Sequence, residues 1–175
     1  MIMGLLFLLA GCSCSQVPET PSTGQIPSPS ATRDPNFNFI FKYGVISPVN
    51  VLDTFENTFT LDMVKDPAVT VNLFLTQADM AVIHQKMKEI DFFNYPSNFN
   101  DRIPPGQPTG NVVPPVVYYF KVKDGAVVKE VTWNAGILYQ DKKADDFESL
   151  SQLIQKIIAS KDEYKRLPKP TSVYL

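Results

Sequence analysis

Apolar and polar residues alternate along the chain from residue 37, and this period of two predicts β-strands. Residues 37–45 place an aromatic ring at every second position, and these rings are Phe37, Phe39, Phe41 and Tyr43. We interpret them as the core-facing side of a strand; a stacking platform for a ligand is the alternative. Residues 50–63 predict two short strands or one bent strand, with a turn at Glu56 and Asn57. Residues 69–75 are apolar and β-branched and predict another strand.

The clearest helix start in the sequence lies at Thr76. Thr76 and Asp79 have the spacing of a capping box, with Asp in place of the usual Glu, and Leu75 and Met80 hold the staple positions. A helical period then predicts one buried face made of Met80, Ile83, Met87 and Ile90. His84 falls at the flank of this face. We interpret it as a boundary residue that packs its ring, and a catalytic or metal-binding role is the alternative.

Residues 116–133 predict a β-hairpin with Asp124 and Gly125 as a two-residue type I′ turn. This loop predicts four facing pairs, which are Val122 with Val127, Phe120 with Lys129, Tyr118 with Val131, and Val116 with Trp133. A register shifted by one residue would turn polar positions onto this apolar face. Lys129 is the exception on the face, and we expect it to reach past Phe120 to the sheet margin rather than toward a ligand. The hairpin therefore predicts a buried Trp133.

A second long helix is expected to begin near Asp145 or Asp146. Its apolar face comprises Phe147, Leu150, Leu153, Ile154, Ile157 and Ile158. Basic residues near its end suit the negative pole of the helix dipole, although contact with anionic lipid is an alternative role; they are Lys161, Lys165 and Arg166. The order of strands, helix, hairpin and helix predicts one α+β domain over residues 37–175, with two helices packed on one face of an antiparallel sheet.

Residues 12–36 differ from the rest of the chain in composition. Prolines recur among Ser, Thr and Gly at positions 18, 21, 27, 29 and 35, and apolar residues are few. Such a segment buries too little apolar surface to offset the entropy of ordering, so we expect a disordered tether. The extended limit of residues 15–36, roughly 65 Å at about 3.1 Å per residue, would hold the following domain away from a membrane.

Both cysteines, Cys12 and Cys14, directly follow an apolar run at residues 2–10. A disulfide across one intervening residue would be strained, and a zinc site would need further ligands. The run is too short to span a membrane but has the length of a signal-peptide core. Leu9-Ala10-Gly11-Cys12 resembles the lipobox of bacterial lipoproteins. The resemblance implies a signal peptide at residues 1–11, cleavage before Cys12 and a diacylglycerol on its thiol.

The N-terminal motif departs from the usual signal peptide in one respect, because no Lys or Arg precedes Cys12. An ordinary secretory signal, or a buried N-terminal helix, is the alternative. Three stretches of the domain, at residues 50–64, 89–96 and 153–170, are similar to small uncharacterised lipoproteins of Gram-positive bacteria. This similarity supports an extracytoplasmic address and the fold, and it implies no activity.

The chain carries 16 Lys and Arg against 18 Asp and Glu, a balance that argues against nucleic acid as a partner. The sequence holds no motif of serine hydrolases, zinc proteases or phosphate-binding loops. We therefore expect no catalytic residues, no cofactor and no metal. The acidic cluster of Asp141, Asp145, Asp146 and Glu148 is interpreted as a solvated helix start. A glycosidase whose two carboxylates are remote in sequence stays open as an alternative.

The long connection at residues 94–115 is the expected place for a ligand or a partner. Loops of this length inside a compact domain are uncommon and are either binding loops or insertions. Tyr95 and Phe99 would offer apolar contact area, and Asp101 and Arg102 would fix orientation at the rim. The alternative is a structural loop in which both rings are buried.

These features together predict an extracytoplasmic lipoprotein, lipid-anchored to the bacterial cell membrane, that acts as a binding or interaction module. Its expected partners are the membrane, through the N-terminal lipid, and an envelope protein or a glycan. The alternative function is a small cell-envelope hydrolase with an unrecognised site. That alternative predicts that two of the Asp, Glu and His84 side chains meet in one cleft.

Overall fold

The computed structural model describes residues 36–174. Its main sheet is six-stranded and antiparallel, in the order β4 (Asp66–Asn72), β3 (Thr58–Met63), β2 (Asn50–Asp53), β1 (Phe37–Val45), β6 (Val116–Asp124) and β7 (Val127–Asn134). A two-stranded sheet pairs β5 (Gly110–Asn111) with β8 (Ile137–Leu138). The helices are α1 (Gln77–Glu89), α2 (Lys142–Ser160) and α3 (Asp162–Lys165), with 3₁₀ turns at Phe92–Asn94 and Phe99–Arg102. The expectations for Cys12, Cys14 and the tether fall outside the described residues.

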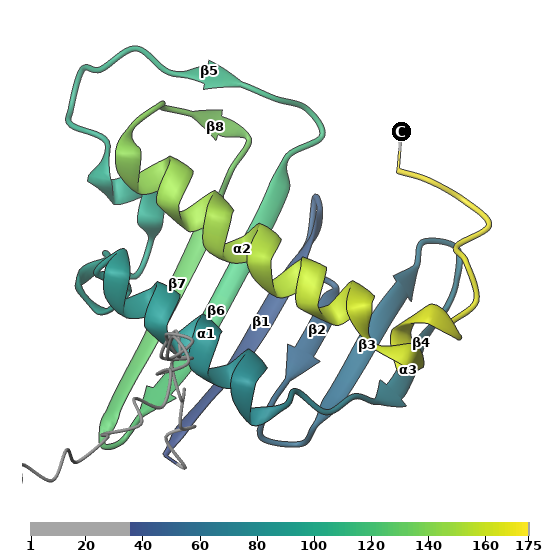
Figure 1. Cartoon of the computed structure of the whole chain (residues 1–175). Coiled ribbons are helices and arrows are strands. Elements are labelled where there is room, and N and C mark those ends of the chain that lie inside the picture. Colours follow the sequence, from purple (N-terminus) through teal and green to yellow (C-terminus); the bar gives the residue numbers. More distant parts are fainter. Residues whose placement is uncertain (1–35, 175) are drawn as a thin grey trace, which may run out of the picture.

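Both long helices cross the same face of the main sheet (Figure 1). Along β1, Phe37, Phe39 and Phe41 are buried, while the residues between them are half-buried. This alternation is expected for a sheet that is covered on one face. The predicted α+β class, with an antiparallel sheet and two helices on one face, is therefore confirmed.

Helix α1 begins at the capping box that the sequence predicts. The Thr76 hydroxyl accepts a hydrogen bond from the Asp79 N–H at 3.1 Å, and the Asp79 carboxylate accepts one from the Thr76 N–H at 2.8 Å. Two of the free donors at the helix start are thereby satisfied. Asp79 also forms an ion pair with Lys161, directly after α2, which ties the two helices together. The predicted helix face is buried and consists of Met80, Ile83, Met87 and Ile90.

Asp79→Asn should lower the free energy of unfolding by about 1 kcal/mol at neutral pH. Burial alone would raise the pKa of Asp79, but hydrogen bonds from Lys161 and Thr76 outweigh burial and hold the pKa below its ordinary value of 3.8. A carboxylate with a lowered folded pKa stabilises the protein above its unfolded pKa and loses this contribution as the pH falls through the folded pKa. Urea unfolding at a series of pH values should show the two proteins converging below pH 3.8.

The matched control for this substitution is Asp162→Asn, at the exposed pair with Lys165. Its unfolding free energy should stay within about 0.5 kcal/mol of the wild-type value at every pH. A deficit of Asp79→Asn that persists unchanged to about pH 2 would show that the ionised carboxylate is not its cause.

Two elements have boundaries that differ from the predictions. Strand β4 spans Asp66–Asn72 rather than residues 69–75, so both of its ends differ, and Pro67 lies inside it. An edge strand tolerates proline because one of its sides makes no ladder hydrogen bonds, and β4 is an edge of the sheet. Helix α2 begins at Lys142 rather than near Asp145 or Asp146. The Asp141 carboxylate caps it there by accepting a hydrogen bond from the Ala144 N–H at 2.8 Å.

The turn of the β6–β7 hairpin also differs from the prediction. Asp124 pairs with Val127, so the two loop residues are Gly125 and Ala126 instead of Asp124 and Gly125. Gly125 has a φ of 60°, and it is the loop residue with positive φ. Positive φ at the first loop position alone is the type II′ pattern rather than type I′.

The changed turn shifts the facing pairs of the hairpin by two residues. Tyr118 faces Trp133, and Val122 faces Lys129. Lys129 is half-buried, and it does not face Phe120 as predicted. A shift of two positions leaves every side chain on its predicted face of the sheet. The predicted burial of Trp133 is accordingly confirmed, with 6% of the residue exposed.

Phe147 of α2 lies at the centre of an aromatic core. Its ring centroid is 4.7 to 6.4 Å from those of Phe92, Tyr95, Phe99, Tyr118, Phe120 and Trp133. These rings come from the hairpin and from the connection between α1 and β6. That connection is thus part of the core rather than an appendage to it.

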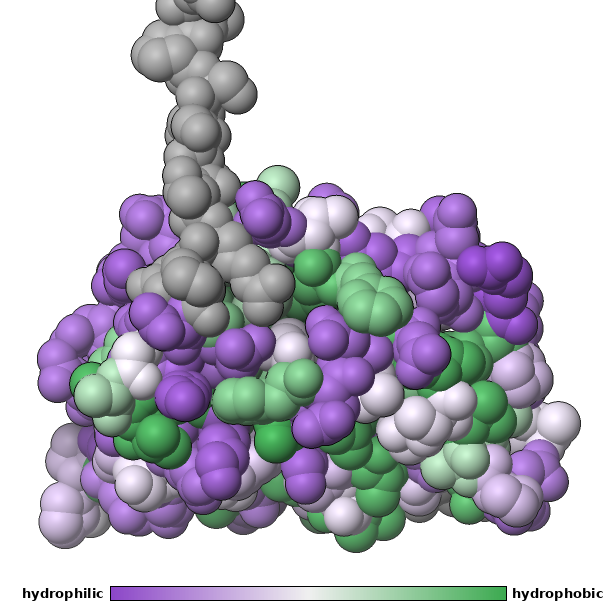
Figure 2. Space-filling model, turned by 90° about the horizontal axis from the view of Figure 1, so that it is seen from below, coloured by the Kyte–Doolittle hydropathy of each residue, from purple (hydrophilic) through white to green (hydrophobic). Residues whose placement is uncertain are grey.

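Exposed apolar residues at the end that carries the β6–β7 turn are interspersed with polar ones (Figure 2). Val127 and Val128, at the start of β7 directly after this turn, are 55% and 57% exposed. Single exposed apolar side chains are ordinary on protein surfaces, whereas a contiguous patch would indicate an interface. The pattern at this end therefore does not indicate a docking surface.

Candidate functional site

A cleft of about 240 Å³ lies between the start of β6, the end of β7, the β5–β8 pair and the first turns of α2. Most of its wall is apolar or aromatic and includes Val112, Val116, Tyr118, Trp133, Leu138 and Tyr139. Its polar lining residues are Gln140, Asp145 and Glu148. Although most of the lining residues are apolar or aromatic, slightly more than half of the accessible cleft surface is polar. A concave site that combines apolar walls with a few polar groups is the usual form of a small-ligand site.

The β5–β8 pair forms a flap at the cleft, and Figure 1 shows it beside the start of α2. Gly110 pairs with Leu138 in the flap, and the Val112 N–H donates to the Gly136 carbonyl at 2.8 Å. A Cβ at Gly136 would lie 2.5 Å from the Pro115 Cβ, well inside the contact distance of two carbon atoms. Glycine at position 136 therefore permits the close approach of the two segments that build the flap.

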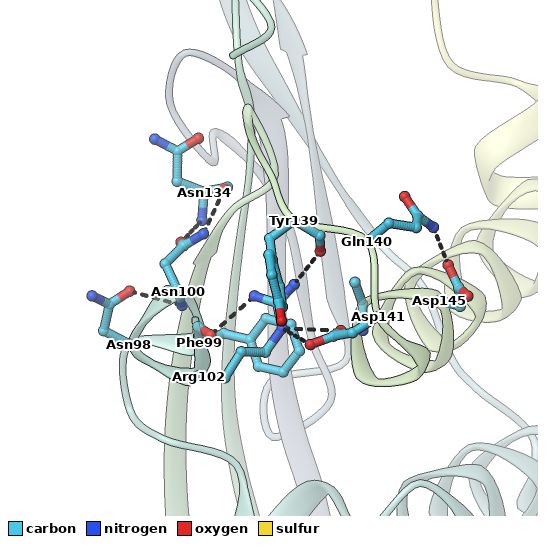
Figure 3. Close-up of polar contacts among 10 residues, drawn as sticks. Asn98, Phe99, Asn100, Arg102, Asn134, Tyr139, Gln140, Asp141 and Asp145 are labelled. Carbon is cyan, nitrogen blue, oxygen red and sulfur yellow. Dashed lines mark hydrogen bonds and ion pairs between the residues drawn. The ribbon is translucent and has the colours of Figure 1, made fainter. Parts of the chain in front are cut away.

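Arg102 holds the cleft wall next to the flap (Figure 3). Its Nε donates to both oxygens of Asp141, at 3.2 and 3.1 Å, and its Nη2 donates to the Tyr139 carbonyl at 2.9 Å. The guanidinium lies 4.2 Å from the ring centroid of Phe99, and only 5% of the Arg102 side chain is exposed. Charge-assisted hydrogen bonds of this kind are stronger than hydrogen bonds between neutral groups. Arg102 thus fixes Tyr139 and Asp141 relative to the connection before β6.

A second polar link joins the same connection to the end of β7 (Figure 3). The Asn100 side chain donates to the Asn134 carbonyl at 3.1 Å and accepts from the Asn134 N–H at 3.0 Å. The Thr132 N–H donates to the Ser97 carbonyl at 2.8 Å. These bonds use backbone groups that the edge of a sheet would otherwise leave free. Hydrogen bonds between the connection and the β7 backbone consequently hold this side of the cleft in place.

Asp145 and Glu148 give the cleft a negative rim. They are three positions apart on α2 and therefore lie on one side of the helix. Asp145 accepts a hydrogen bond from Gln140 at 2.5 Å, and Glu148 accepts one from Gln152 at 3.1 Å, so both partners are neutral. Burial, followed by the charge of Glu148, raises the pKa of the Tyr118 hydroxyl. The Tyr118 ring therefore stays neutral beside the two carboxylates at physiological pH.

Trp133 forms the inner wall of the cleft. Its ring stacks on Tyr118 and Phe147, with centroid distances of 5.4 and 5.0 Å. Its Nε1–H is buried and has no hydrogen-bond partner among the described residues, as is also true of the Tyr95 hydroxyl. Buried polar groups in proteins are nearly always paired, so an unpaired one calls for an explanation. The Nε1 atom is closed off from the cleft as well as from bulk water, so this donor is not accessible to a ligand in the cleft.

The four residues predicted to form a binding loop do not line this cleft. Tyr95 and Phe99 are 2% and 0% exposed, so neither ring offers contact area. Their burial matches the alternative of a structural loop, because both rings pack against Phe147. Arg102 is held by Asp141, and Asp101 is exposed and accepts a hydrogen bond from Asn98 at 2.6 Å. Binding of a partner at this loop stays a prediction.

His84 lies at the other end of β6 from the cleft. Its ring stacks on Phe37 at 4.1 Å, and its Nε2 lies 2.9 Å from an Asp124 oxygen. With 8% of the residue exposed, the interpretation of His84 as a packing residue is confirmed. The His84–Asp124 pair ties α1 to the tip of the hairpin.

Neither a candidate metal centre nor a membrane-spanning helix occurs among residues 36–174. No group of three or more His, Cys, Asp or Glu side chains in that range could hold a metal ion. None of its helices is both long enough and apolar enough to cross a bilayer. Comparison of the chain with protein-family models and with curated proteins yields no match. The geometry of the cleft is therefore the observation that bears on function.

Sequence patterns do not reveal most residues of the cleft. No predicted element covers the segment that holds Tyr139 and Gln140, and Asp145 and Glu148 are predicted only as a solvated helix start. One signal was available, which is the spacing of these two carboxylates on the flank of an apolar helix face. That spacing places them on one side of α2 but does not indicate which segment faces them.

Proposed function

We propose that the protein is a lipid-anchored, extracytoplasmic module of the bacterial cell envelope that binds a small ligand in the cleft between the flap and α2. The observation that carries this proposal is the lining of the cleft, where packed aromatic walls meet two carboxylates paired only with neutral amides. A well-formed pocket with apolar walls and a few polar side chains is the usual first candidate for a binding site.

The sequence Leu9-Ala10-Gly11-Cys12 supports the proposed anchor, because two acyl chains on one residue suffice for stable attachment. Phe37 pairs with Asp124 at one end of β6, while Val116, at the other end, lines the cleft. The eight residue steps of β6 between them, at about 3.4 Å each, correspond to about 27 Å. A protein attached ahead of β1 would thus carry its cleft at the end of the sheet away from the attachment.

A hydrolase that uses Asp145 and Glu148 is the second candidate, and one observation favours it, namely that both carboxylates line the cleft. A carboxyl group that acts as a general acid in glycoside hydrolysis is held in apolar surroundings. Asp145 and Glu148 are both exposed, which favours binding over catalysis. Release of sugar from cell-wall glycan by the wild-type protein, and its loss in Glu148→Gln, would favour the hydrolase instead.

Thermal unfolding with a small-molecule extract of bacterial cells tests the binding proposal. A compound that binds only the folded state should raise the Tm of the full chain. Ala135→Leu adds bulk at a half-buried position of the cleft wall and should remove this increase. Ala126→Leu, in the exposed hairpin loop, is the control and should retain it. No increase in the wild-type protein, or an equal one in Ala135→Leu, would contradict ligand binding in the cleft.

Cys12→Ser should release the protein into the medium or leave it unprocessed, because serine offers no thiol for the diacylglycerol. Cell fractionation followed by mass measurement of the protein checks this result. Cys14→Ser serves as the control and should remain at the membrane. Cys12→Ser protein that is still membrane-bound and normally cleaved would rule out the proposed anchor.

A further inference from the structure

The two carboxylates of the cleft differ from their neighbours at the same end of α2. Asp141 and Asp146 are each paired with a basic side chain. Asp145 and Glu148 have no ion-pair partner among residues 36–174, and no Lys or Arg lines the cleft. A cleft lined by charge of one sign concentrates ligands of the opposite sign. The rim therefore favours a cationic ligand.

The remaining walls favour an organic cation over a metal ion. Calcium and magnesium require roughly six or more oxygen ligands in a compact shell, whereas most of this lining is apolar or aromatic. The cleft volume of about 240 Å³ lies just below the usual range of ligand pockets, about 300 to 1,000 Å³, and therefore suits a small ligand.

Three aromatic residues line the same cleft, and they are Tyr118, Trp133 and Tyr139. Aromatic faces attract alkylammonium groups, and clusters of such rings are the usual receptors of quaternary ammonium ions. Tyr118 is half-buried and leaves part of its ring accessible, while the Tyr139 ring lies 5.8 Å from the Arg102 guanidinium on one side.

We propose that the ligand is a small organic ammonium ion of the class to which choline belongs. Its cationic nitrogen lies at Asp145 and Glu148, and its carbon groups lie against Tyr118 and Trp133. This assignment rests on the proposed function, since it names the ligand class of the same cleft.

Titration calorimetry of the full chain in non-ionic detergent tests the ligand class. Choline is compared with neohexanol, its uncharged isostere in which a carbon atom replaces the nitrogen. Choline should bind at least about tenfold more tightly. Glu148→Gln and Asp145→Asn should each weaken choline binding about fivefold and leave neohexanol binding unchanged.

Glu89→Gln is the matched control for Glu148→Gln. Glu89 also accepts a hydrogen bond from a glutamine on its own helix, Gln85 at 3.2 Å, but it does not line the cleft. Its substitution should leave choline binding unchanged. All three substituted side chains belong to exposed residues, and thermal unfolding verifies that each variant is folded.

Three outcomes would overturn the ammonium assignment. Equal affinity for choline and neohexanol would show that charge is not recognised. Choline binding that both cleft substitutions leave unchanged would place the cation elsewhere. Binding of neither compound would also overturn it. If neither compound binds, the Tm measurement with the cell extract separates the two proposals. A Tm increase that Ala135→Leu abolishes would keep the cleft as a binding site for another class of ligand. No Tm increase would contradict both the ligand class and the proposed function.

Discussion

Phe147→Ala should lower the free energy of unfolding by about 4 kcal/mol, near the upper end of the range for single substitutions. Phe147 is fully buried, and its ring packs against Phe120 and Trp133 of the hairpin and against Phe99 of the preceding connection. Truncation removes this apolar contact and leaves a cavity, because rings held by several elements cannot all move inward. Urea unfolding followed by far-ultraviolet circular dichroism measures the effect.

Phe74→Ala is the matched control, since the Phe74 residue is 62% exposed. Its unfolding free energy should stay within about 0.5 kcal/mol of the wild-type value. A loss below about 1 kcal/mol for Phe147→Ala would mean that the sheet, α2 and the connection do not share one core.

Arg102→Met should lower the free energy of unfolding by about 3 kcal/mol. Methionine keeps much of the apolar stem but leaves the Asp141 carboxylate and the Tyr139 carbonyl without their donors. Because 28% of the Asp141 side chain is exposed, water compensates in part, and the loss stays near the lower end for a broken buried pair. Urea unfolding gives the free energy, and hydrogen exchange should show faster exchange in residues 137–141.

The control for this change is Arg166→Met. Arg166 is exposed, and among the described residues its side chain donates only to the Asp162 carbonyl, at 3.1 Å. Its substitution should change the unfolding free energy by less than about 0.5 kcal/mol. Equal, small effects for the two variants would show that Arg102 does not join the connection to α2.

The elements that local patterns encode could be predicted from the sequence. The alternating rings of residues 37–45 place β1, and the spacing of Thr76 and Asp79 places the start of α1, because each signal lies within a few residues. The class of fold follows from the order of these elements. The start of α2 is less visible, since Asp141 caps the helix without an acidic or amide side chain at position 144 to complete a capping box.

The hairpin register shows where local patterns end. Loops at Asp124-Gly125 and at Gly125-Ala126 place the same side chains on the same face, so hydrophobic alternation cannot separate them. In the observed register, Asp124 contacts residues that are remote in sequence. Asp124 pairs with Phe37 in the neighbouring strand and forms a hydrogen bond with His84 of α1.

The cleft could not be predicted from the sequence for the same reason. Its walls come from the end of one connection, the two ends of the hairpin, the segment between β7 and α2, and the start of α2. The link that holds them together, Arg102 to Asp141, spans 39 residues. Such a contact depends on tertiary packing, and neither residue carries a motif that would indicate it.

The proton–nitrogen correlation spectrum of the full chain in detergent micelles tests the binding role of the cleft most directly. Trp133 is the only tryptophan, so its Nε1–H gives a single indole signal from the cleft wall. Addition of choline should shift this signal to saturation, together with the backbone signals of Gly136, Leu138 and Glu148. Cleft signals that stay in place with both choline and the small-molecule cell extract, or shifts confined to other surfaces, would contradict the proposal that the cleft between the flap and α2 is the ligand site.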